Sequence, residues 1–166
     1  MILIGIGASL PGPDGTPPIE TCRAAVVALA ELPGLRLEAL SRWWEAAPVP
    51  PMPGAPWFVN GVARLSGMMD GAAILAALHA IEAKHHRARP YANAPRTLDL
   101  DLLSVDGQLA DTPALSLPHP RMAQRGFVLH PLAEVAPGWR HPISGEPVAT
   151  LIARLPAQEL RPLTTA

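Results

Sequence analysis

The stretch from residue 95 to residue 105 limits what this chain can fold into more than any other part of it. It reads Pro-Arg-Thr-Leu-Asp-Leu-Asp-Leu-Leu-Ser-Val, so apolar and acidic residues alternate from Leu98 to Leu102. A period of two predicts a β-strand, because successive side chains on a strand point to opposite faces. Asp99 and Asp101 then share one face, about 7 Å apart, while the leucines enter a core on the other face.

Two carboxylates side by side on one face of a sheet repel each other. A bound cation relieves this repulsion, and Mg²⁺ is the simplest choice because it takes carboxylate oxygens and leaves coordination positions for phosphate. Arg96 lies just upstream and carries a guanidinium group suited to phosphate. The motif therefore predicts a metal–nucleotide site. The alternative is a solvated polar face on an edge strand.

Composition argues against several classes of partner. Thirteen basic and 14 acidic residues leave no net field that would attract nucleic acid or a membrane surface. No stretch approaches the roughly 20 apolar residues of a membrane span. Cys22 is the single cysteine, which fits a reducing compartment, and we expect a cytoplasmic protein. The length of 166 residues predicts one domain over residues 1–166.

Hydrophobic periodicity predicts strands that alternate with helices. The strands are expected over residues 1–6, 35–43, 57–65 and 98–105. One helix lies between the first two of them and another between the last two. The resulting β-α-β-β-α-β order indicates the α+β class, a ferredoxin-like split βαββαβ sandwich with additions at the C-terminus.

Capping and turn residues place the ends of these elements. Thr16 can cap the first helix, which Pro33 and Gly34 would stop, and Asp70 can cap the second. Asp106 and Gly107 form a turn signal that could return the chain as a short hairpin. Two further helices are expected over residues 128–136 and 148–155.

Two loops and one short cluster hold further candidate ligands. The proline-rich residues 46–56 and the arginine-containing residues 87–95 are loops of the kind that often close over ligands. His119 lies between two prolines, which limit its backbone freedom, and Arg125 precedes a glycine. Each of these is weak alone, but several donors set against one aspartate pair suit a triphosphate with its metal.

These motifs together resemble the 6-hydroxymethyl-7,8-dihydropterin pyrophosphokinase family of the folate pathway. The resemblance is carried by residues 95–101, Pro118-His119-Pro120 and Arg125-Gly126-Phe127, and it extends over nearly the whole chain. Members of that family have a ferredoxin-like fold and transfer the β,γ-diphosphate of ATP to the pterin hydroxymethyl group, with two Mg²⁺ ions, releasing AMP. The resemblance thus implies ATP and the pterin as small-molecule substrates, and we expect a monomer.

The resemblance also implies roles for individual residues. Asp99 and Asp101 match the metal-binding aspartates and are expected to be catalytic. The positions that match ATP-binding residues are Arg87, Arg89, Arg96, His119 and Arg125. Arg87 and Arg89 match arginines of a mobile loop and are also expected to be catalytic, and Glu82 matches a position that supports the nucleotide side.

On the pterin side, Phe58 and Phe127 match two aromatic residues that stack on the two faces of the ring. Asn60 matches the asparagine that hydrogen-bonds the pterin. The chain departs from the family at several positions: Asn93-Ala94 in place of Trp-Gly, Ala8-Ser9 in place of Ser-Asn, Ala47 in place of Thr, and His79 in place of Gln. None of these changes removes a metal ligand or a phosphate-binding arginine, so we expect an active enzyme.

Three alternative functions remain open. Gly5-Ile6-Gly7 after a strand suggests a dinucleotide-binding oxidoreductase, although Leu10 stands where the third glycine belongs. A zinc protein is suggested by residues that share one helix face, namely His79, Glu82 and His86. The third alternative is a catalytically silent pterin- and nucleotide-binding module of the same fold, which would not convert ATP to AMP.

Overall fold

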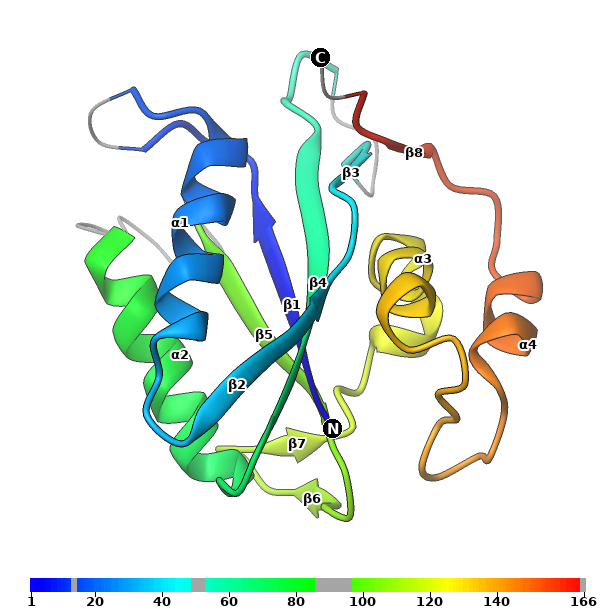
Figure 1. Cartoon of the computed structure of the whole chain (residues 1–166). Helices are drawn as coiled ribbons and strands as arrows, with labels where there is room; N and C mark the ends of the chain where they lie inside the picture. The colour runs from blue at the N-terminus through cyan, green and yellow to red at the C-terminus, as the bar shows by residue number, and fades with distance from the viewer. Residues whose placement is uncertain (13–14, 49–52, 86–96, 165–166) are drawn as a thin grey trace.

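An antiparallel β-sheet forms the centre of the molecule (Figure 1). The computed structural model describes residues 1–12, 15–48, 53–85 and 97–164. In this part of the chain the sheet has six strands, which are β1 (Ile2–Ala8), β2 (Leu35–Leu40), β3 (Trp44–Ala46), β4 (Phe58–Gly67), β5 (Asp99–Val105) and β8 (Leu160–Pro162). Their order is β5-β1-β4-β3-β8, and β2 pairs with β4 as well. The short strands β6 (Ala110–Asp111) and β7 (Ser116–Leu117) pair with each other in a separate sheet.

Helices cover both faces of the sheet, and the two faces enclose different cores. Figure 1 shows α1 (Pro18–Ala30) and α2 (Gly71–His85) on one face, and α3 (Gly126–Val135) and α4 (Val148–Ala153) on the other. A short 3₁₀ helix, Met122–Gln124, leads into α3. None of the helices in the described ranges is both long and apolar enough to cross a bilayer. The fold is therefore α+β, with an antiparallel sheet between two helical layers.

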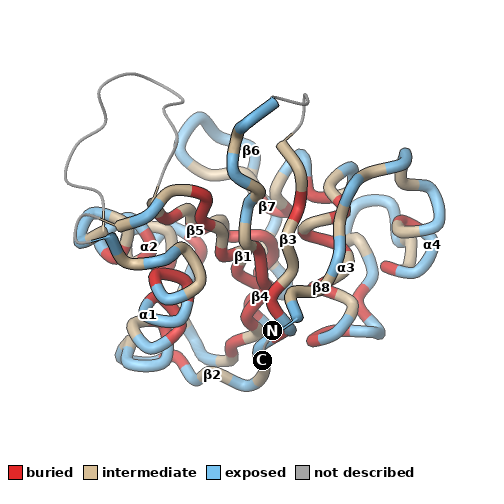
Figure 2. The backbone as a smooth tube through the Cα atoms, turned by 90° about the horizontal axis from the view of Figure 1, so that it is seen from above, coloured by how far each residue is buried: buried red, intermediate tan, exposed pale blue. Residues whose placement is uncertain are grey.

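Alternation along the central strands divides their side chains between the two cores. Ile2, Ile4 and Ile6 of β1 are buried in the core beneath α1 and α2, whereas Leu3 is buried in the core beneath α3 and α4. Leu98, Leu100 and Leu102 likewise belong to the α1–α2 core. Figure 2 shows the buried residues gathered along β1, β4 and β5. The predicted strand is confirmed, and its leucines lie where the alternation puts them.

Two of the expected strand features differ in the structure. The strand expected over residues 35–43 ends at Leu40, and the separate strand β3 begins at Trp44. The Ser41 side chain enters the ladder at the break, where its Oγ accepts a hydrogen bond of 2.9 Å from the Val62 N–H. The turn at Asp106 and Gly107 is present, with Gly107 at φ 75°. The chain does not return along β5 after this turn, because β6 pairs with β7.

One of the two predicted helix caps is confirmed and the other is wrong. Asp70 Oδ1 accepts a hydrogen bond of 2.8 Å from the Ala73 N–H at the start of α2. Thr16 does not cap α1, which starts at Pro18 with Pro17 in the capping position and no side-chain cap. Pro17 takes the capping position instead, and its carbonyl oxygen accepts the first hydrogen bonds of the helix, from the N–H groups of Glu20 at 3.0 Å and Thr21 at 3.2 Å.

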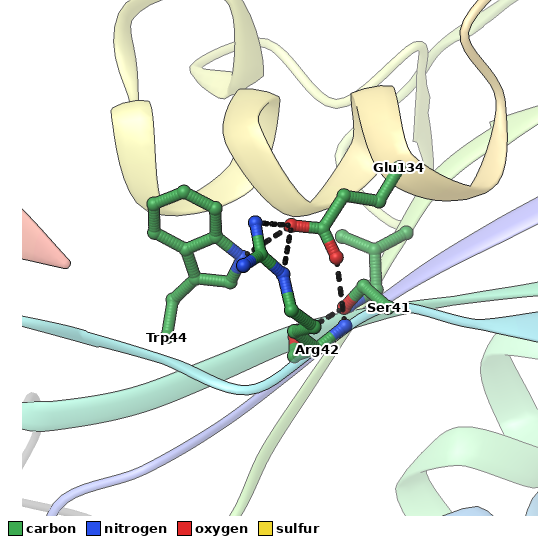
Figure 3. A network of polar contacts seen from close by, with 5 residues as sticks. Ser41, Arg42, Trp44 and Glu134 are labelled. Carbon is green, nitrogen blue, oxygen red and sulfur yellow. Dashed lines mark hydrogen bonds and ion pairs between the residues drawn. The ribbon is translucent and has the colours of Figure 1, made fainter. Parts of the chain in front are cut away.

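A polar network fixes α3 against the junction of β2 and β3 (Figure 3). Glu134 of α3 accepts hydrogen bonds from the Arg42 backbone N–H at 2.8 Å and from Trp44 Nε1 at 2.9 Å. The Arg42 guanidinium also forms an ion pair with Glu134 at 3.1 Å. The Trp44 ring in turn packs on His130, with ring centroids 5.2 Å apart. These contacts hold the start of β3 in place beside α3.

The position of His130 predicts a pH dependence of stability. Burial lowers the pKa of His130 below its ordinary value of 6.5, an effect that the charge of Glu134 opposes only in part. In the interval between the folded-state pKa and 6.5, the unfolded chain binds the proton more readily than the folded protein, so acidification destabilises the fold there. We expect the free energy of unfolding to fall as the pH drops from about 7 to about 5.

Replacing His130→Gln should make this dependence shallower, as measured by denaturant unfolding at each pH. His79, which is exposed on α2, provides the matched control. His79→Gln should keep the pH dependence of the wild-type protein. Equal slopes for the His130 variant and the wild type would contradict the prediction.

Candidate functional site

A cavity of about 420 Å³ lies between the sheet and the start of α3. Its walls come from β1, β3, β4, β5, the turn before α3 and the C-terminal segment. The residues that line it are Gly5, Ile6, Gly7, Ala46, Ala47, Phe58, Asn60, Gly61, Asp99, Asp101, Gln124, Arg125, Phe127, Val128 and Gln158. Segments far apart in the sequence therefore meet at one hollow on the α3 face of the sheet.

The hollow exists because two of the three α3-facing positions of β1 are glycines. Leu3 fills that face near the start of the strand and is buried in the core beneath α3. Gly5 and Gly7, two and four residues later, share the face of Leu3 because side chains alternate along a strand. Their neighbours Ile4 and Ile6 point into the opposite core. Backbone therefore forms the floor of the cavity.

Strand pairing puts the acidic residues and the amide on opposite sides of this floor. Gly7 is paired with Asn60 on β4 and with Asp99 on β5. Gly5 is paired with Asp101 on the β5 side. Asp99 and Asp101 are both partly buried and both line the cavity. A ligand lying across the glycines would thus meet carboxylates at one edge and an amide at the other.

Asn60 is held in a narrow place on the β4 side. Its side chain is buried, and its Nδ2 donates a long hydrogen bond of 3.4 Å to the Phe58 carbonyl oxygen. Its Oδ1 lies only 3.0 Å from where a Cβ on Gly7 would stand. The exposed Phe58 is at the rim, paired with Ala46 of β3. A flat polar ligand could hydrogen-bond the amide and contact this ring.

The turn before α3 supplies the opposite wall. Arg125 directly precedes the helix, and its carbonyl oxygen accepts hydrogen bonds of 3.0 Å from the N–H groups of Val128 and Leu129. Its guanidinium lies 5.5 Å from the centre of the Phe127 ring. A positive charge and an aromatic face are therefore held next to each other, opposite the sheet.

His119 lies beside the cavity but does not line it. Its backbone N–H donates to the Leu103 carbonyl at 2.8 Å, and its Nδ1 accepts from the Arg121 N–H at 3.2 Å. Burial lowers the pKa of His119; the Asp101 charge opposes this, and the charges of Arg125 and Arg121 add to it. The neutral imidazole then carries its hydrogen on Nε2, which leaves one N–H to donate.

The end of α2 holds the aspartate strand from its outer edge. Glu82 Oε2 accepts a hydrogen bond of 2.9 Å from the N–H of Leu100, the residue between the two aspartates. Thr97 Oγ1 donates to the His85 carbonyl at 2.6 Å. Glu82 thus faces β5, while His79 is exposed, and the described residues contain no cluster of three or more metal-binding side chains. The zinc alternative stays untested, because its third member, His86, lies outside the described residues.

The dinucleotide-binding alternative is wrong, because its glycines have another role. Gly5 and Gly7 lie inside β1 and not in a turn that opens a helix. The helix α1 begins only at Pro18, well beyond the end of the strand. A phosphate-binding fingerprint needs its glycines at the strand-to-helix turn.

The structure gathers most of the predicted site residues around one cavity. Those that line it are Phe58, Asn60, Asp99, Asp101, Arg125 and Phe127. The predicted residues Arg87, Arg89 and Arg96 lie outside the described part of the chain. Sequence reasoning missed the floor formed by Gly5 and Gly7, although the same period-two rule places both on one face. It also missed Gln158, for which no local pattern gives a signal.

The fold and the cavity define an α+β protein with a candidate small-molecule site, and comparison with known proteins identifies the family. Residues 3–137 match the family described as 7,8-dihydro-6-hydroxymethylpterin-pyrophosphokinase. The chain belongs to this family.

Three similar proteins support the assignment. A 2-amino-4-hydroxy-6-hydroxymethyldihydropteridine pyrophosphokinase of Pseudomonas aeruginosa is 39% identical over 165 residues, which are 99% of this chain and 98% of the relative. A protein of the same name from Synechocystis is 33% identical, over 97% of this chain and 79% of the relative. The folic acid synthesis protein fol1 of Schizosaccharomyces pombe is 29% identical over 86% of this chain but only 19% of its own length. The resemblance inferred from the sequence motifs is confirmed.

The glycine floor can be tested by adding single methyl groups. A Cβ at Gly5 meets its nearest atoms at 3.5 Å or more, which is ordinary contact, whereas one at Gly7 meets Asn60 Oδ1 at 3.0 Å. Alanine is favoured over glycine in a strand interior by about 0.5–1 kcal/mol. We expect Gly5→Ala to keep or raise the free energy of unfolding, and Gly7→Ala to lower it by about 1–3 kcal/mol through overpacking.

Denaturant unfolding measures the two free energies. The NMR resonances of the Asn60 side-chain amide should shift in the Gly7 variant far more than in the Gly5 variant. Equal stability changes and equal shifts in the two variants would contradict the assigned floor.

Proposed function

We propose that the cavity is the active site for transfer of diphosphate from ATP to the hydroxymethyl group of 6-hydroxymethyl-7,8-dihydropterin, with release of AMP. Pyrophosphokinase activity in folate biosynthesis follows from membership of the family. The observation that carries the assignment to this cavity is the pair Asp99 and Asp101, set across a glycine floor from Asn60. No feature of the described residues favours a catalytically silent module.

The pterin occupies the side of the cavity next to β4. Phe58 and Phe127 line the cavity from β4 and α3, which suits stacking on the two faces of a flat ring. The buried amide of Asn60, paired with Gly7 of the floor, lines the same cavity and can hydrogen-bond the polar edge of the pterin. The absence of side chains on Gly5 and Gly7 lets such a ring lie close to the strand.

ATP and its metal occupy the side next to β5. Enzymes of this kind act with a divalent metal, and we propose two Mg²⁺ ions held by Asp99 and Asp101. The donor set fits, because both carboxylates face the cavity and Mg²⁺ is usually bound by one or two carboxylates together with substrate phosphates and waters. When bound there, Mg²⁺ would neutralise phosphate charge and lower the pKa of the pterin hydroxyl.

The transfer is an in-line displacement. The pterin hydroxyl oxygen attacks the β-phosphorus of ATP, the bond from that phosphorus to the oxygen bridging the α-phosphate breaks, and AMP leaves. Arg125 stabilises the negative charge that builds on the phosphate oxygens. In the neutral His119, Nδ1 accepts the hydrogen bond from the Arg121 N–H and Nε2 carries the hydrogen. This Nε2–H donates a hydrogen bond to a phosphate oxygen. Arg87, Arg89 and Arg96 are proposed to add to this charge stabilisation, on the strength of the family resemblance alone.

We further propose that the scaffold is the ferredoxin-like split βαββαβ arrangement, in one domain. β2 and β3 both pair with β4 and can be counted as one interrupted strand. The order β5-β1-β4-β2/β3 is then that of the fourth, first, third and second strands of such a sandwich. We also propose, as expected from the sequence, that a monomer in the cytoplasm is the active form.

The aspartates can be tested by isosteric replacement. Asp99→Asn and Asp101→Asn keep the side-chain shape but remove the charge that holds the metal. We expect AMP formation from ATP and the pterin alcohol to fall by about 10³-fold in each variant, because metal and oxyanion stabilisation carry most of the barrier reduction. Asp111→Asn, in the exposed part of β6, is the control and should leave turnover unchanged. Near-normal turnover in either site variant would exclude the metal role.

The pterin pocket can be tested by calorimetry on the two substrates separately. Asn60→Ala leaves the pterin edge without its partner, a loss of about 1–3 kcal/mol. Phe127→Ala removes stacking of roughly 0.5–1.5 kcal/mol beyond the burial it provides. We expect both variants to bind the pterin more weakly, while binding of a non-hydrolysable ATP analogue to the pterin-free protein stays almost unchanged. A matching loss of analogue binding would show that the two sides of the cavity are assigned wrongly.

A further inference from the structure

The C-terminal segment after α4 returns to the cavity and forms part of its wall. β8 pairs with β3, so that Leu160 lies opposite Ala46. The Ala47 N–H extends this contact by donating to the Glu159 carbonyl at 3.1 Å. Gln158, one residue before Glu159, lines the cavity. The strand pairing therefore sets where Gln158 lies.

Side-chain contacts strengthen the anchor of this segment. Arg161 forms an ion pair with Glu45 of β3, and its guanidinium lies 4.6 Å from the centre of the Trp57 ring. The Leu163 N–H donates to the Trp43 carbonyl at 2.8 Å. With these contacts on its C-terminal side, Gln158 is held against the turn that precedes α3.

Gln158 bonds to the backbone on both sides of Arg125. Its Oε1 accepts a hydrogen bond of 2.9 Å from the Gly126 N–H, and its Nε2 donates one of 3.1 Å to the Gln124 carbonyl. The Gly126 N–H is at the first position of α3, where no carbonyl of the helix can accept it. A Cβ at Gly126 would stand 2.7 Å from Gln158 Oε1, so the close contact depends on glycine at this position.

We propose that Gln158 is a positioning residue that fixes Arg125, and with it Phe127, for the transfer reaction. The proposal rests on the function proposed above. Arg125, the residue in the capping position of α3, makes no side-chain cap. The Gln158 side chain instead restrains the peptide groups before and after Arg125. The family match ends at residue 137, well before this residue. A group misplaced by about 1 Å can cost on the order of 100-fold in rate.

The chain offers a matched control for this clamp. Gln108 Oε1 accepts a hydrogen bond of 2.8 Å from the N–H of Gly71, the first residue of α2. The same type of side chain therefore satisfies the same type of helix N-terminus, but away from the cavity. Substitution of either glutamine removes a hydrogen bond to the first N–H of a helix, and only the Gln158 substitution can affect the position of Arg125.

The experiment compares Gln158→Met with Gln108→Met in the full-length enzyme. Methionine keeps the length of the side chain, and hence the cavity wall, but removes both hydrogen bonds. We expect kcat for AMP formation to fall about tenfold or more in the Gln158 variant, with a smaller change in the KM for ATP, since a misplaced arginine loses most in the transition state. The Gln108 variant should lose thermal stability through its own lost hydrogen bond but keep kcat within about twofold of wild type.

A second measurement does not depend on turnover. In the Gln158 variant the Gly126 amide should exchange its hydrogen faster, and the Arg125 and Phe127 amide resonances should shift, while in the Gln108 variant these signals stay as in the wild type. If the wild type is active and the Gln158 variant has the same kcat, the positioning role alone would be overturned. Failure of the wild type to form AMP would instead contradict the proposed function, and unchanged Gly126 exchange would contradict the clamp itself.

Discussion

The cavity depends on one constraint, the absence of side chains at two alternate positions of the central strand. β1 is paired on both edges, with β4 on one side and β5 on the other. The Leu3 side chain fills the α3 face of the sheet, whereas Gly5 and Gly7 leave space there for the cavity. Both neighbouring strands are paired in register with β1. The positions of the two glycines therefore also determine which residues of β4 and β5 lie beside the opening. Aspartates stand on one side and an asparagine on the other, with backbone between them.

The other wall has to be brought to this floor from a distance, and two separate contacts do so. Glu134 ties the C-terminal end of α3 to the junction between β2 and β3 through Arg42 and Trp44. Gln158 ties the start of the same helix to the C-terminal segment, which is itself paired with β3. Both contacts connect α3 to the same side of the sheet. The positions of α3 and of the C-terminal segment are therefore both fixed relative to β3.

Sequence reasoning succeeded where the structure depends on residues close together in the chain. It failed where the structure depends on contacts between segments far apart in the sequence. The period of two around Asp99 and Asp101 is a property of one strand, so the shared face of the aspartates followed from the sequence alone. The division of the strand at Ser41 did not, because it depends on a hydroxyl that bonds Val62 on another strand. Gln158 was beyond reach for the same reason, since only the pairing of β8 with β3 brings it to Arg125.

The two faces of the sheet divide stability and chemistry between them. The core on the α1–α2 face includes aliphatic side chains that alternate along β1 and β5. The α3 face can therefore carry a hollow, two carboxylates and a buried amide, each of which costs stability when taken alone. The alternation joins both halves of this arrangement, because the strand residues that put Leu100 into one core necessarily turn Asp99 and Asp101 toward the cavity. A one-residue slip of β5 against β1 would bury the carboxylates and expose the leucines. The hydrogen bond from Leu100 to Glu82 lies at the outer edge of β5, where it adds a restraint on that strand from outside the sheet.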